Sequence, residues 1–231
     1  LSIRAFTKNQ YCLFLVDNAS VDDATRELLE ELVDPIYDKT DNELDVRVVR
    51  LGQNKSFSNS VNAGVQAGTA SVVVILNDDA IVTEGWDAHL VQDVTDESVG
   101  MSGARSNYAS GLQGTGAVAP DAPFLVFVCV AIRRKLWEEI GPLDEVTFDG
   151  FSSEDLDYSW RVRWCVAGLD QTTGQRVLVK QPAPVRRLRV SEAFVLHAGS
   201  RTLQAQLGSL QALDANNTKY MARLEQKWGK E

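Results

Sequence analysis

One short segment limits what this chain can fold into more than any other, the run from Ser71 to Val82. Its first part, Val72–Leu76, is a continuous series of β-branched and aliphatic residues, which is typical of a strand buried on both faces. Such strands occur in parallel sheets that are covered by helices on both sides. The segment therefore predicts an α/β fold with a sheet between helical layers.

The predicted strand ends on polar side chains, those of Asn77, Asp78 and Asp79. In open α/β sheets, ligands bind at the carboxyl ends of the strands. Clustered carboxylate oxygens are preferred ligands of a hard divalent cation, which would neutralise the charge of a bound nucleoside diphosphate. Asp and Asn are also ordinary turn residues, so these three residues alone fit an acidic turn equally well.

The composition is that of an ordinary globular protein. The chain has 231 residues, of which 44% are hydrophobic and 24% are charged, and we expect a single domain over residues 1–231. The net charge of −9 argues against broad affinity for nucleic acids, which bind to basic surfaces. The longest apolar run, Phe124–Ile132, is far shorter than the ~20 residues of a membrane-spanning helix, so we expect a soluble, cytoplasmic protein.

The cysteines give no sign of a metal site or of disulfide bonds. Cys12, Cys129 and Cys165 are widely spaced and lie among apolar neighbours. This spacing matches neither a zinc site nor a disulfide framework. We expect small core residues in a reducing compartment.

Strands and helices alternate along the first hundred residues. Tyr11–Val16 is a second predicted buried strand, and it also ends on an acid and an amide, Asp17 and Asn18. Two strands with the same ending predict one shared cleft. The sequence also predicts a helix that is capped by Ser20, ends before Pro35 and has an apolar stripe formed by Leu28, Leu29, Leu32 and Val33. The other elements expected here are strands Val46–Leu51 and Val99–Ala104 and helices Phe57–Gly68 and Trp86–Val94. This alternation predicts a mostly parallel sheet with helices on both faces.

The second half is less regular. A stretch rich in glycine and proline, Arg105–Pro123, predicts a mobile loop near the site. The elements expected after it are a strand Phe124–Ile132, a helix Arg133–Ile140, a loop Leu143–Ser153, a helix from Glu154 to about Val166 capped by Ser152 or Ser153, a hairpin Gln171–Val195 and a largely helical tail Leu203–Trp228. For the hairpin's basic residues, Lys180, Arg186, Arg187 and Arg189, we favour a solvated face over contact with an anionic acceptor.

In chain order these segments resemble the family 2 glycosyltransferases, which have a GT-A type, Rossmann-like fold that binds nucleotide sugars. The matching pieces are Val16–Ser20 with Asp22, Asn54, Phe57–Asn62 with Gly64, Leu76–Asp79, Ala131–Arg134, Gly141, Asp144–Glu145, Glu154–Asp157 with Arg161, His197, Tyr220 and Lys227–Gly229. They cover nearly the whole chain. The resemblance implies a donor-binding half in residues 1–100 and an acceptor and catalytic half in residues 101–231.

The resemblance implies a metal ion at the end of the Val72–Leu76 strand. Asp78 and Asp79 would hold it against the donor diphosphate, with Asp79 as the more direct ligand, and His197 would complete the shell. Mn²⁺ tolerates mixed oxygen and imidazole ligands better than Mg²⁺ does, so we expect Mn²⁺ and allow Mg²⁺. The other histidine, His89, is expected to be a bystander in a helix.

The donor and the catalytic base follow from the same resemblance. Asp17 would accept a hydrogen bond from a ring N–H of uracil or thymine, which favours a UDP or dTDP sugar, and Asn54 and Asn62 are further candidates for donor contacts. Asp155 would be the general base that deprotonates the acceptor hydroxyl, and Glu154 would bind the acceptor or orient the base. The product would have an inverted anomeric configuration. Asp157 we interpret as a partner of the helix dipole.

Two departures from the family pattern are visible. Leu1–Phe6 resembles the end of the family's first helix, so the opening strand is missing and we expect further residues upstream. The span Gly168–His197 is longer than the family's usual hairpin.

Two other functions remain open. One is a sugar nucleotidyltransferase on a related fold, and the other is a non-catalytic binding module. The acceptor also remains open between a saccharide, a lipid carrier, a protein and a modified nucleic-acid base, because acceptors are read by loops.

Overall fold

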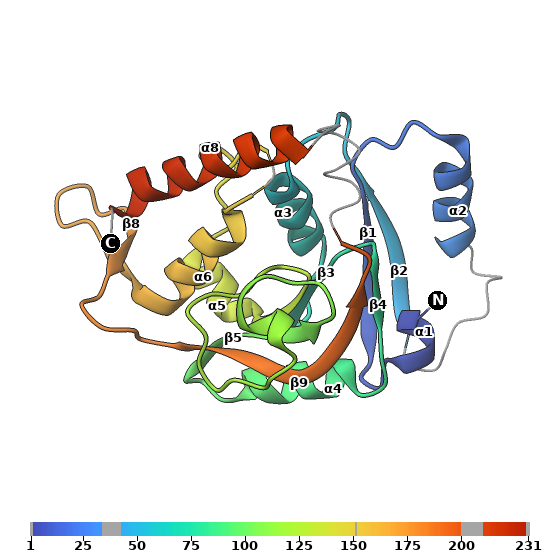
Figure 1. Cartoon of the computed structure of the whole chain (residues 1–231), viewed down its shortest axis with the longest axis horizontal. Coiled ribbons are helices and arrows are strands. Elements are labelled where there is room, and N and C mark those ends of the chain that lie inside the picture. Colours follow the sequence, from blue (N-terminus) through green and yellow to red (C-terminus); the bar gives the residue numbers. More distant parts are fainter. Residues whose placement is uncertain (1, 34–42, 151, 200–209, 230–231) are drawn as a thin grey trace.

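The computed structural model describes residues 2–33, 43–150, 152–199 and 210–229 (Figure 1). A central sheet has the strand order β3 (Val72–Leu76), β6 (Cys129–Arg133), β5 (Val99–Ser106), β9 (Arg187–His197) and β4 (Ala80–Val82). The other elements are α1 (Ser2–Phe6), β1 (Tyr11–Asp17), α2 (Asp23–Val33), β2 (Glu43–Arg50), α3 (Phe57–Ala67), α4 (Trp86–Thr95), the 3₁₀ helix η1 (Gly111–Thr115), α5 (Arg134–Ile140), α6 (Glu154–Trp164), β7 (Cys165–Leu169), β8 (Arg176–Lys180) and α8 (Leu210–Trp228).

The α/β sheet predicted from the sequence is confirmed. β3, β5 and β9 run in one direction, and β6 and β4 run in the other. β6 lies between β3 and β5, so it makes antiparallel pairs that the alternation of strands and helices did not predict. None of the described helices is long and apolar enough to cross a membrane.

Both faces of β3 are covered, as its run of apolar residues predicted. Val73 and Ile75 lie in one cluster of buried side chains, to which α3, α5 and α6 contribute. Val72, Val74 and Leu76 pack against a second cluster, which contains the buried face of α4. The sheet therefore lies between two helical layers, and its strand ends are the places where polar side chains reach solvent.

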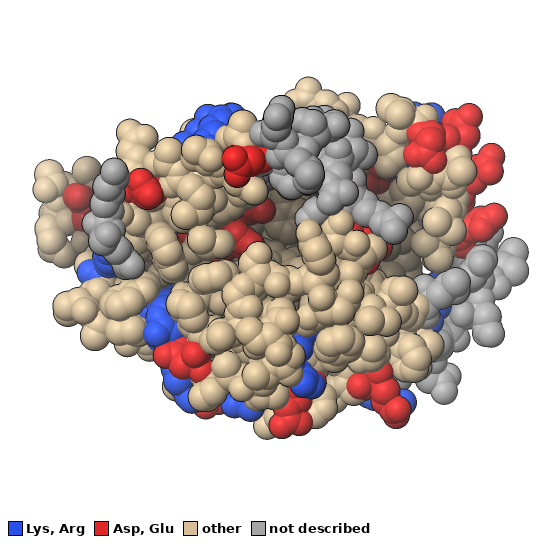
Figure 2. All heavy atoms as spheres, in the orientation of Figure 1, with Lys and Arg blue, Asp and Glu red and all other residues tan. Residues whose placement is uncertain are grey.

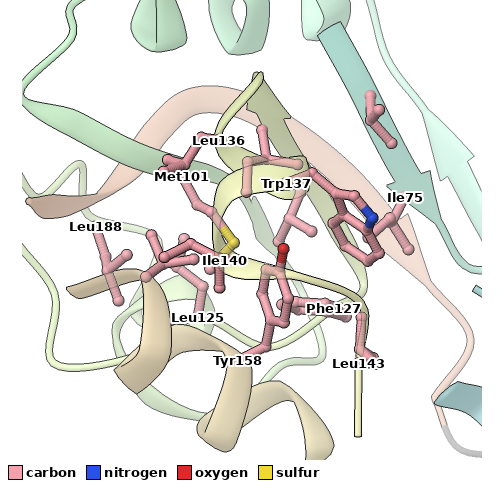
Figure 3. Close-up of a cluster of buried hydrophobic side chains, with 14 of the residues drawn as sticks. Ile75, Met101, Leu125, Phe127, Leu136, Trp137, Ile140, Leu143, Tyr158 and Leu188 are labelled. Carbon is pink, nitrogen blue, oxygen red and sulfur yellow. The ribbon is translucent and has the colours of Figure 1, made fainter. Parts of the chain in front are cut away.

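The first cluster fixes the orientation of α6 (Figure 3). Tyr158 of α6 is fully buried, and its ring lies 4.8 Å from the ring of Trp137 in α5 and 5.9 Å edge-on from the ring of Phe127. Large aromatic side chains contribute much of the free energy of burial in a core. The packing of Tyr158 therefore fixes the position of the first turn of α6, which carries Glu154 and Asp155.

β1 and β2 form a second, parallel sheet. α3 joins it to the central sheet, because α3 packs on β1 while its residues Val61 and Val65 lie in the first core cluster. A Cβ atom on Gly64 would lie 2.9 Å from the side chain of Val16, so a glycine is needed where α3 meets β1. The prediction of a further strand upstream of Leu1 stays a prediction.

The hairpin predicted over Gln171–Val195 is wrong. α6 ends at Trp164, and the hairpin is formed by β7 and β8 instead. The second half of the predicted hairpin belongs to β9, which joins the central sheet parallel to β5. Leu188 and Val190 are fully buried there, because alternate residues of β9 face the core.

The basic residues near β9 are paired inside the protein. Their carboxylate partners lie on α4, on the residue that follows α4 and on α5. The ion pairs are Arg186 with Glu139 at 2.7 Å, Arg187 with Asp96 at 2.9 Å and Arg189 with Asp93 at 2.8 Å. Lys180 lies 5.3 Å from the centre of the Trp228 ring. Arg186 and Arg189 are thus largely covered, whereas the side chain of Arg187 is 43% exposed and Lys180 is exposed, as expected of a solvated face.

Smaller boundaries also differ from the expected ones. The strand expected over Phe124–Ile132 begins only at Cys129. α2 begins at Asp23 and is capped by Asp22, whose carboxylate accepts the N–H of Thr25, rather than by Ser20. The loop expected over Arg105–Pro123 contains η1 and is fixed by the buried side chain of Gln113.

Candidate functional site

The end of β3 and the end of β9 meet at Asp79 and His197. Antiparallel pairing of β4 with β9 places Ala80 opposite His197, so Asp79 lies beside the histidine. The Nε2 atom of His197 lies 2.9 Å from Oδ1 of Asp79. His197 is buried, Asp79 is partly exposed and Asp78 is exposed. Two of the three predicted metal ligands are thus in contact, although 118 positions of sequence separate them.

The imidazole of His197 is held by the turn that follows β5. Its Nδ1 atom lies 2.8 Å from the backbone oxygen of Tyr108, and because a carbonyl only accepts, Nδ1 carries a proton. The side chain of Asn107 accepts the N–H of His197 at 2.7 Å and donates to its backbone oxygen at 3.1 Å. In the neutral ring, Nε2 therefore directs a lone pair toward the Asp79 carboxylate.

Two acceptors facing each other at this distance need a positive charge between them. That charge is either a second proton on the imidazole or a cation. The carboxylate oxygen and the imidazole nitrogen fit Mn²⁺, and the hydrogen bond from Nδ1 to a backbone carbonyl is the usual support of a metal-binding histidine. Asn77 adds a third group, because its Oδ1 atom is buried without a hydrogen-bond partner. The residues present therefore fit a divalent cation.

The protein alone supplies few ligands at this point. Within the described ranges, no group of three or more His, Cys, Asp or Glu side chains is arranged to hold a metal ion. Divalent cations that work with nucleotides are often bound by one or two carboxylates together with phosphate oxygens and water. A site with Asp79 and His197 is complete only with such a ligand.

Glu154 and Asp155 lie in the first turn of α6 and have unusual acidity. Burial raises the pKa of Glu154 well above the usual range of a carboxyl, and the neighbouring charge of Asp155 raises it further. Burial also raises the pKa of Asp155, although the backbone N–H groups of Leu156 and Phe127 oppose the rise. A carboxylate with a raised pKa is a better proton acceptor near neutral pH than an ordinary one.

The turn before these two residues has strained backbone. Ser152 and Ser153 have φ angles of 122° and 66°, and the Ser152 N–H donates to Oε2 of Glu154 at 2.7 Å. Non-glycine residues rarely adopt such angles, and they cluster at functional sites. Ser153 precedes α6, yet its side chain makes no cap hydrogen bond, so the expected serine cap is not formed.

The acidic pair and the histidine site are joined by two consecutive residues. The backbone N–H of Phe127 lowers the pKa of Asp155, and the backbone oxygen of Val128 accepts the N–H of Asn77 at 2.9 Å. The same short segment of chain therefore influences Asp155 and holds the end of β3, which precedes Asp79. Figure 2 shows a hollow across this side of the molecule, with acidic atoms set back inside it.

α8 supports the loop that carries the acidic pair. Side chains of α8 contact the loop before α6 and the first turn of α6. The contacts are Tyr220 to Asp149 at 2.9 Å, Arg223 to the backbone oxygen of Thr147 at 2.7 Å, Lys227 to Asp144 at 2.7 Å and to Asp157 at 2.9 Å, and Trp228 to Asp157 at 2.8 Å. Asp157 is fully buried and also pairs with Arg161, so it is a buried ion-pair partner, which the expected interaction with the helix dipole did not predict.

The other predicted donor residues form two further groups. Asp17 is buried at the end of β1, and its carboxylate accepts the Ser20 N–H at 2.8 Å and a guanidinium N–H of Arg50 at 2.9 Å. Burial raises the pKa of Asp17, but these bonds outweigh it, and the pKa lies below the usual range. Asn18 follows Asp17 in the chain, and its side-chain amide donates a hydrogen bond to the side-chain oxygen of Asn54 at 3.3 Å.

Asn62 has a different position. Its amide bonds to both backbone groups of Leu143 and to the carboxylate of Glu145, at 2.7 to 3.0 Å. These bonds fasten α3 to the loop after α5. The donor contact expected of Asn62 stays a prediction. His89 is half exposed and lies 4.0 Å from Glu192, which agrees with a bystander.

Sequence reasoning missed Asn107 and Tyr108. Both lie in the stretch that was expected to be a mobile loop, and no spacing or charge pattern marks them. Their contacts with His197 depend on the parallel pairing of β5 with β9, which brings the ends of these strands together.

Known structures share this fold at low sequence identity. GalNAc-T7 with UDP, GalNAc and Mn²⁺ matches 85% of this chain with a TM-score of 0.62 at 17% identity. The mannosyltransferase PcManGT from Pyrobaculum calidifontis, in complex with GDP-Man and Mn²⁺, matches 76% with a TM-score of 0.52 at 20% identity. TarS of S. aureus, residues 1–349, matches 97% with a TM-score of 0.56 at 13% identity. The predicted GT-A type fold is confirmed.

The matched part is a fraction of each of those proteins. It spans 39% of the GalNAc-T7 chain, 46% of the PcManGT chain and 65% of the TarS chain. No curated protein sequence matches this one. The family profile of glycosyl transferase family 2 matches residues 1–141, which is more than half of the sequence. The chain therefore belongs to glycosyl transferase family 2.

Proposed function

We propose that this protein is an inverting, metal-dependent glycosyltransferase that moves a sugar from a nucleoside diphosphate sugar to an acceptor hydroxyl. The observation that carries the proposal is the contact of Asp79 with His197 at 2.9 Å, in a histidine whose other nitrogen is fixed by a backbone carbonyl. Together with the acidic pair of α6, this contact provides separate groups for the leaving diphosphate and for the acceptor.

Residues from both halves of the chain take part in this proposal. Residues 1–100 supply Asp17, Asn54, Asp78 and Asp79 for the donor. Residues 101–231 supply His197 and the acidic pair. The site is thus shared within one domain.

We assign UDP or dTDP as the nucleotide of the donor. Asp17 keeps free lone pairs on a carboxylate that already accepts two hydrogen bonds, and a ring N–H of uracil or thymine is a suitable further donor. The GalNAc-T7 structure was determined with UDP and the PcManGT structure with GDP-Man, so guanine is the alternative base to test. Both of those structures were determined with Mn²⁺, which supports Mn²⁺ ahead of Mg²⁺ as the metal ion of this protein.

In this proposal Asp79 and His197 would hold the cation, and Asp78 and Asn77 would supply further oxygen ligands. When bound, a divalent cation stabilises the negative charge of the departing diphosphate. Asp155 accepts the proton of the acceptor hydroxyl while the oxygen attacks the anomeric carbon from the face opposite the diphosphate. The bond from the anomeric carbon to the diphosphate oxygen breaks with its electron pair, and the configuration inverts. Glu154 orients Asp155 or the acceptor.

A thermal-shift experiment tests the donor site. UDP, dTDP, GDP, CDP and ADP are each added with and without Mn²⁺ to the protein, to Asp79→Ala and to a control, Asp23→Ala, whose carboxylate lies on α2 and is 88% exposed. A hundredfold excess of ligand over its Kd stabilises the folded state by about 2.7 kcal/mol. That corresponds to roughly 5 to 10 °C for a chain of this size.

The expected result is a shift by UDP or dTDP that requires Mn²⁺, survives in Asp23→Ala and disappears in Asp79→Ala. A shift by UDP without metal, retained in Asp79→Ala, would contradict the metal site. No shift with any nucleotide would support a non-catalytic module instead.

A further inference from the structure

The side chain of Tyr108 is fixed at the edge of the histidine site, and part of its ring is exposed. The residue is 52% exposed, and its ring centre lies 5.9 Å from that of His197 at an angle of 58°. Its backbone is held at both ends, because the N–H donates to Oγ of Ser106 at 3.2 Å and the oxygen accepts from His197 at 2.8 Å. The ring is therefore presented to solvent by a turn that is bonded to the site.

The ring already packs closely against the backbone at Gly199. Gly199 has a φ angle of 84°, and a Cβ atom there would lie 2.6 Å from the Tyr108 ring. The glycine allows the chain after β9 to pass directly against the aromatic side chain. A ring supported in this way loses little conformational freedom when a ligand stacks on it, because Tyr has few rotatable bonds.

The stretch of chain that begins next to Tyr108 has no charged side chains of its own. The segment from Asn107 to Pro120 contains no Lys, Arg, Asp or Glu, and it includes two more exposed apolar side chains, Leu112 and Val118. The front of the molecule over this segment, between β5 and β6, is largely tan in Figure 2. An exposed apolar surface beside a polar site is typical of a ligand-binding surface.

The cationic side chains of β9 that could attract a polyanion are paired elsewhere. Arg187 and Arg189 pair with carboxylates at 2.8 to 2.9 Å. The chain as a whole carries a net charge of −9. The guanidinium of Arg105 is held near this segment by the backbone oxygens of Gly116 and Glu192, at 2.9 and 2.6 Å. The net negative charge of the chain nevertheless disfavours an acceptor with many phosphate or sulfate groups. An uncharged sugar has one apolar face, formed by its C–H groups, which suits an aromatic ring.

We propose that the Tyr108 ring is a stacking platform for an uncharged sugar ring of the acceptor, so the acceptor is a neutral saccharide. The inference rests on the proposed function, since it places the acceptor sugar beside the histidine that holds the donor's cation. It assigns the exposed ring of Tyr108 to acceptor binding.

The test compares Tyr108→Phe, which keeps the ring, with Tyr108→Leu, which keeps apolar bulk without a flat face. The probes are neutral oligosaccharides of glucose, galactose, mannose and N-acetylglucosamine, and the sulfated forms of the same sugars. Binding is followed by saturation-transfer NMR in the presence of UDP and Mg²⁺. We expect the protein and Tyr108→Phe to bind a neutral probe, and Tyr108→Leu to bind it about tenfold more weakly.

Three results would overturn the inference. They are equal binding by Tyr108→Leu and the unchanged protein, binding of sulfated probes only, and binding of no neutral probe. The shift in melting temperature with UDP and Mn²⁺, measured on each variant, separates this test from the proposed function. If the shift is present in the unchanged protein and Tyr108→Leu binds normally, the inference fails and the donor site stands.

Discussion

The side chain of Asn107 makes two hydrogen bonds with the backbone of His197, one in each direction, at 2.7 and 3.1 Å. The amide therefore fixes the position of the residue in the chain, and the neighbouring carbonyl of Tyr108 fixes the direction of its ring. In the proposed site these two bonds hold a metal ligand that otherwise lies at the end of a strand. Groups of this kind behind a ligand commonly contribute 10- to 100-fold to metal affinity.

Replacing Asn107 by Ala is expected to raise the Mn²⁺ concentration needed for the nucleotide-dependent thermal shift about tenfold. The reason is that the backbone N–H and the backbone oxygen of His197 lose their hydrogen bonds to Asn107, while the Asp79 carboxylate remains. The matched control is Ser110→Ala in the same segment, because Ser110 is exposed and its side chain makes no cap hydrogen bond. Equal Mn²⁺ requirements in Asn107→Ala and Ser110→Ala would show that the two bonds do not position the ligand.

The rate of sugar transfer is expected to rise with pH over a range above that of an ordinary carboxyl. A general base acts only in its deprotonated form, and the pKa of Asp155 is raised by burial above its usual value of about 4. The measurement is release of nucleoside diphosphate from the donor between pH 4.5 and 8.5. Asp155→Asn should lose roughly 100-fold or more, and Glu154→Gln should lose less. If the rate of release rises with a midpoint near pH 4, Asp155 is ruled out as the base.

The residues of the proposed site could be named from the sequence, but the residues that support them could not. Asp79, His197 and Asp155 stood out because acids and a rare histidine follow predicted strands or begin a predicted helix, in the order of a known family. Sequence order carries that information. The contacts of His197 with Asn107 arise from the pairing of β5 with β9, which no local pattern encodes.

Two errors have clear physical causes. Cys165–Leu169 is a short run of small and apolar residues, and such runs do not distinguish the end of a helix from a strand. β9 could not be recognised from the sequence pattern, because basic residues occupy alternate positions in it and their carboxylate partners come from distant parts of the chain.

Lys227 at the end of α8 is expected to be important for stability. Its ammonium group lies 2.7 Å from Asp144 and 2.9 Å from Asp157, which is fully buried. Lys227→Met leaves both carboxylates with one partner fewer, and we expect a loss of about 2 kcal/mol in the free energy of unfolding. Lys135→Met on α5 is the control, since Lys135 is exposed. Urea denaturation measures both, and similar midpoints for the two variants would argue against the proposed role of the ion pairs.

Glu154→Gln is expected to stabilise the protein at pH 8 and to change little at pH 5. Burial raises the folded-state pKa of Glu154 above its unfolded value of about 4.3, so the folded protein holds a proton that the unfolded chain releases. Stability therefore falls as pH rises from the unfolded pKa to the folded pKa, and it stays low above that range. Glutamine has no charge to bury, and its side-chain oxygen still accepts the Ser152 N–H.

The size of this effect is set by how far the pKa is raised. We expect Glu154→Gln to gain roughly 2 kcal/mol at pH 8, or several degrees in melting temperature. The control Glu138→Gln removes an exposed carboxylate from α5 and should show the same small change at both pH values. If the melting temperatures of Glu154→Gln and the unchanged protein differ equally at pH 5 and pH 8, the carboxyl is ionised throughout, and burial does not hold its proton. A pH-dependent gain would show that this protein keeps an uncharged acid beside its proposed base at the cost of stability.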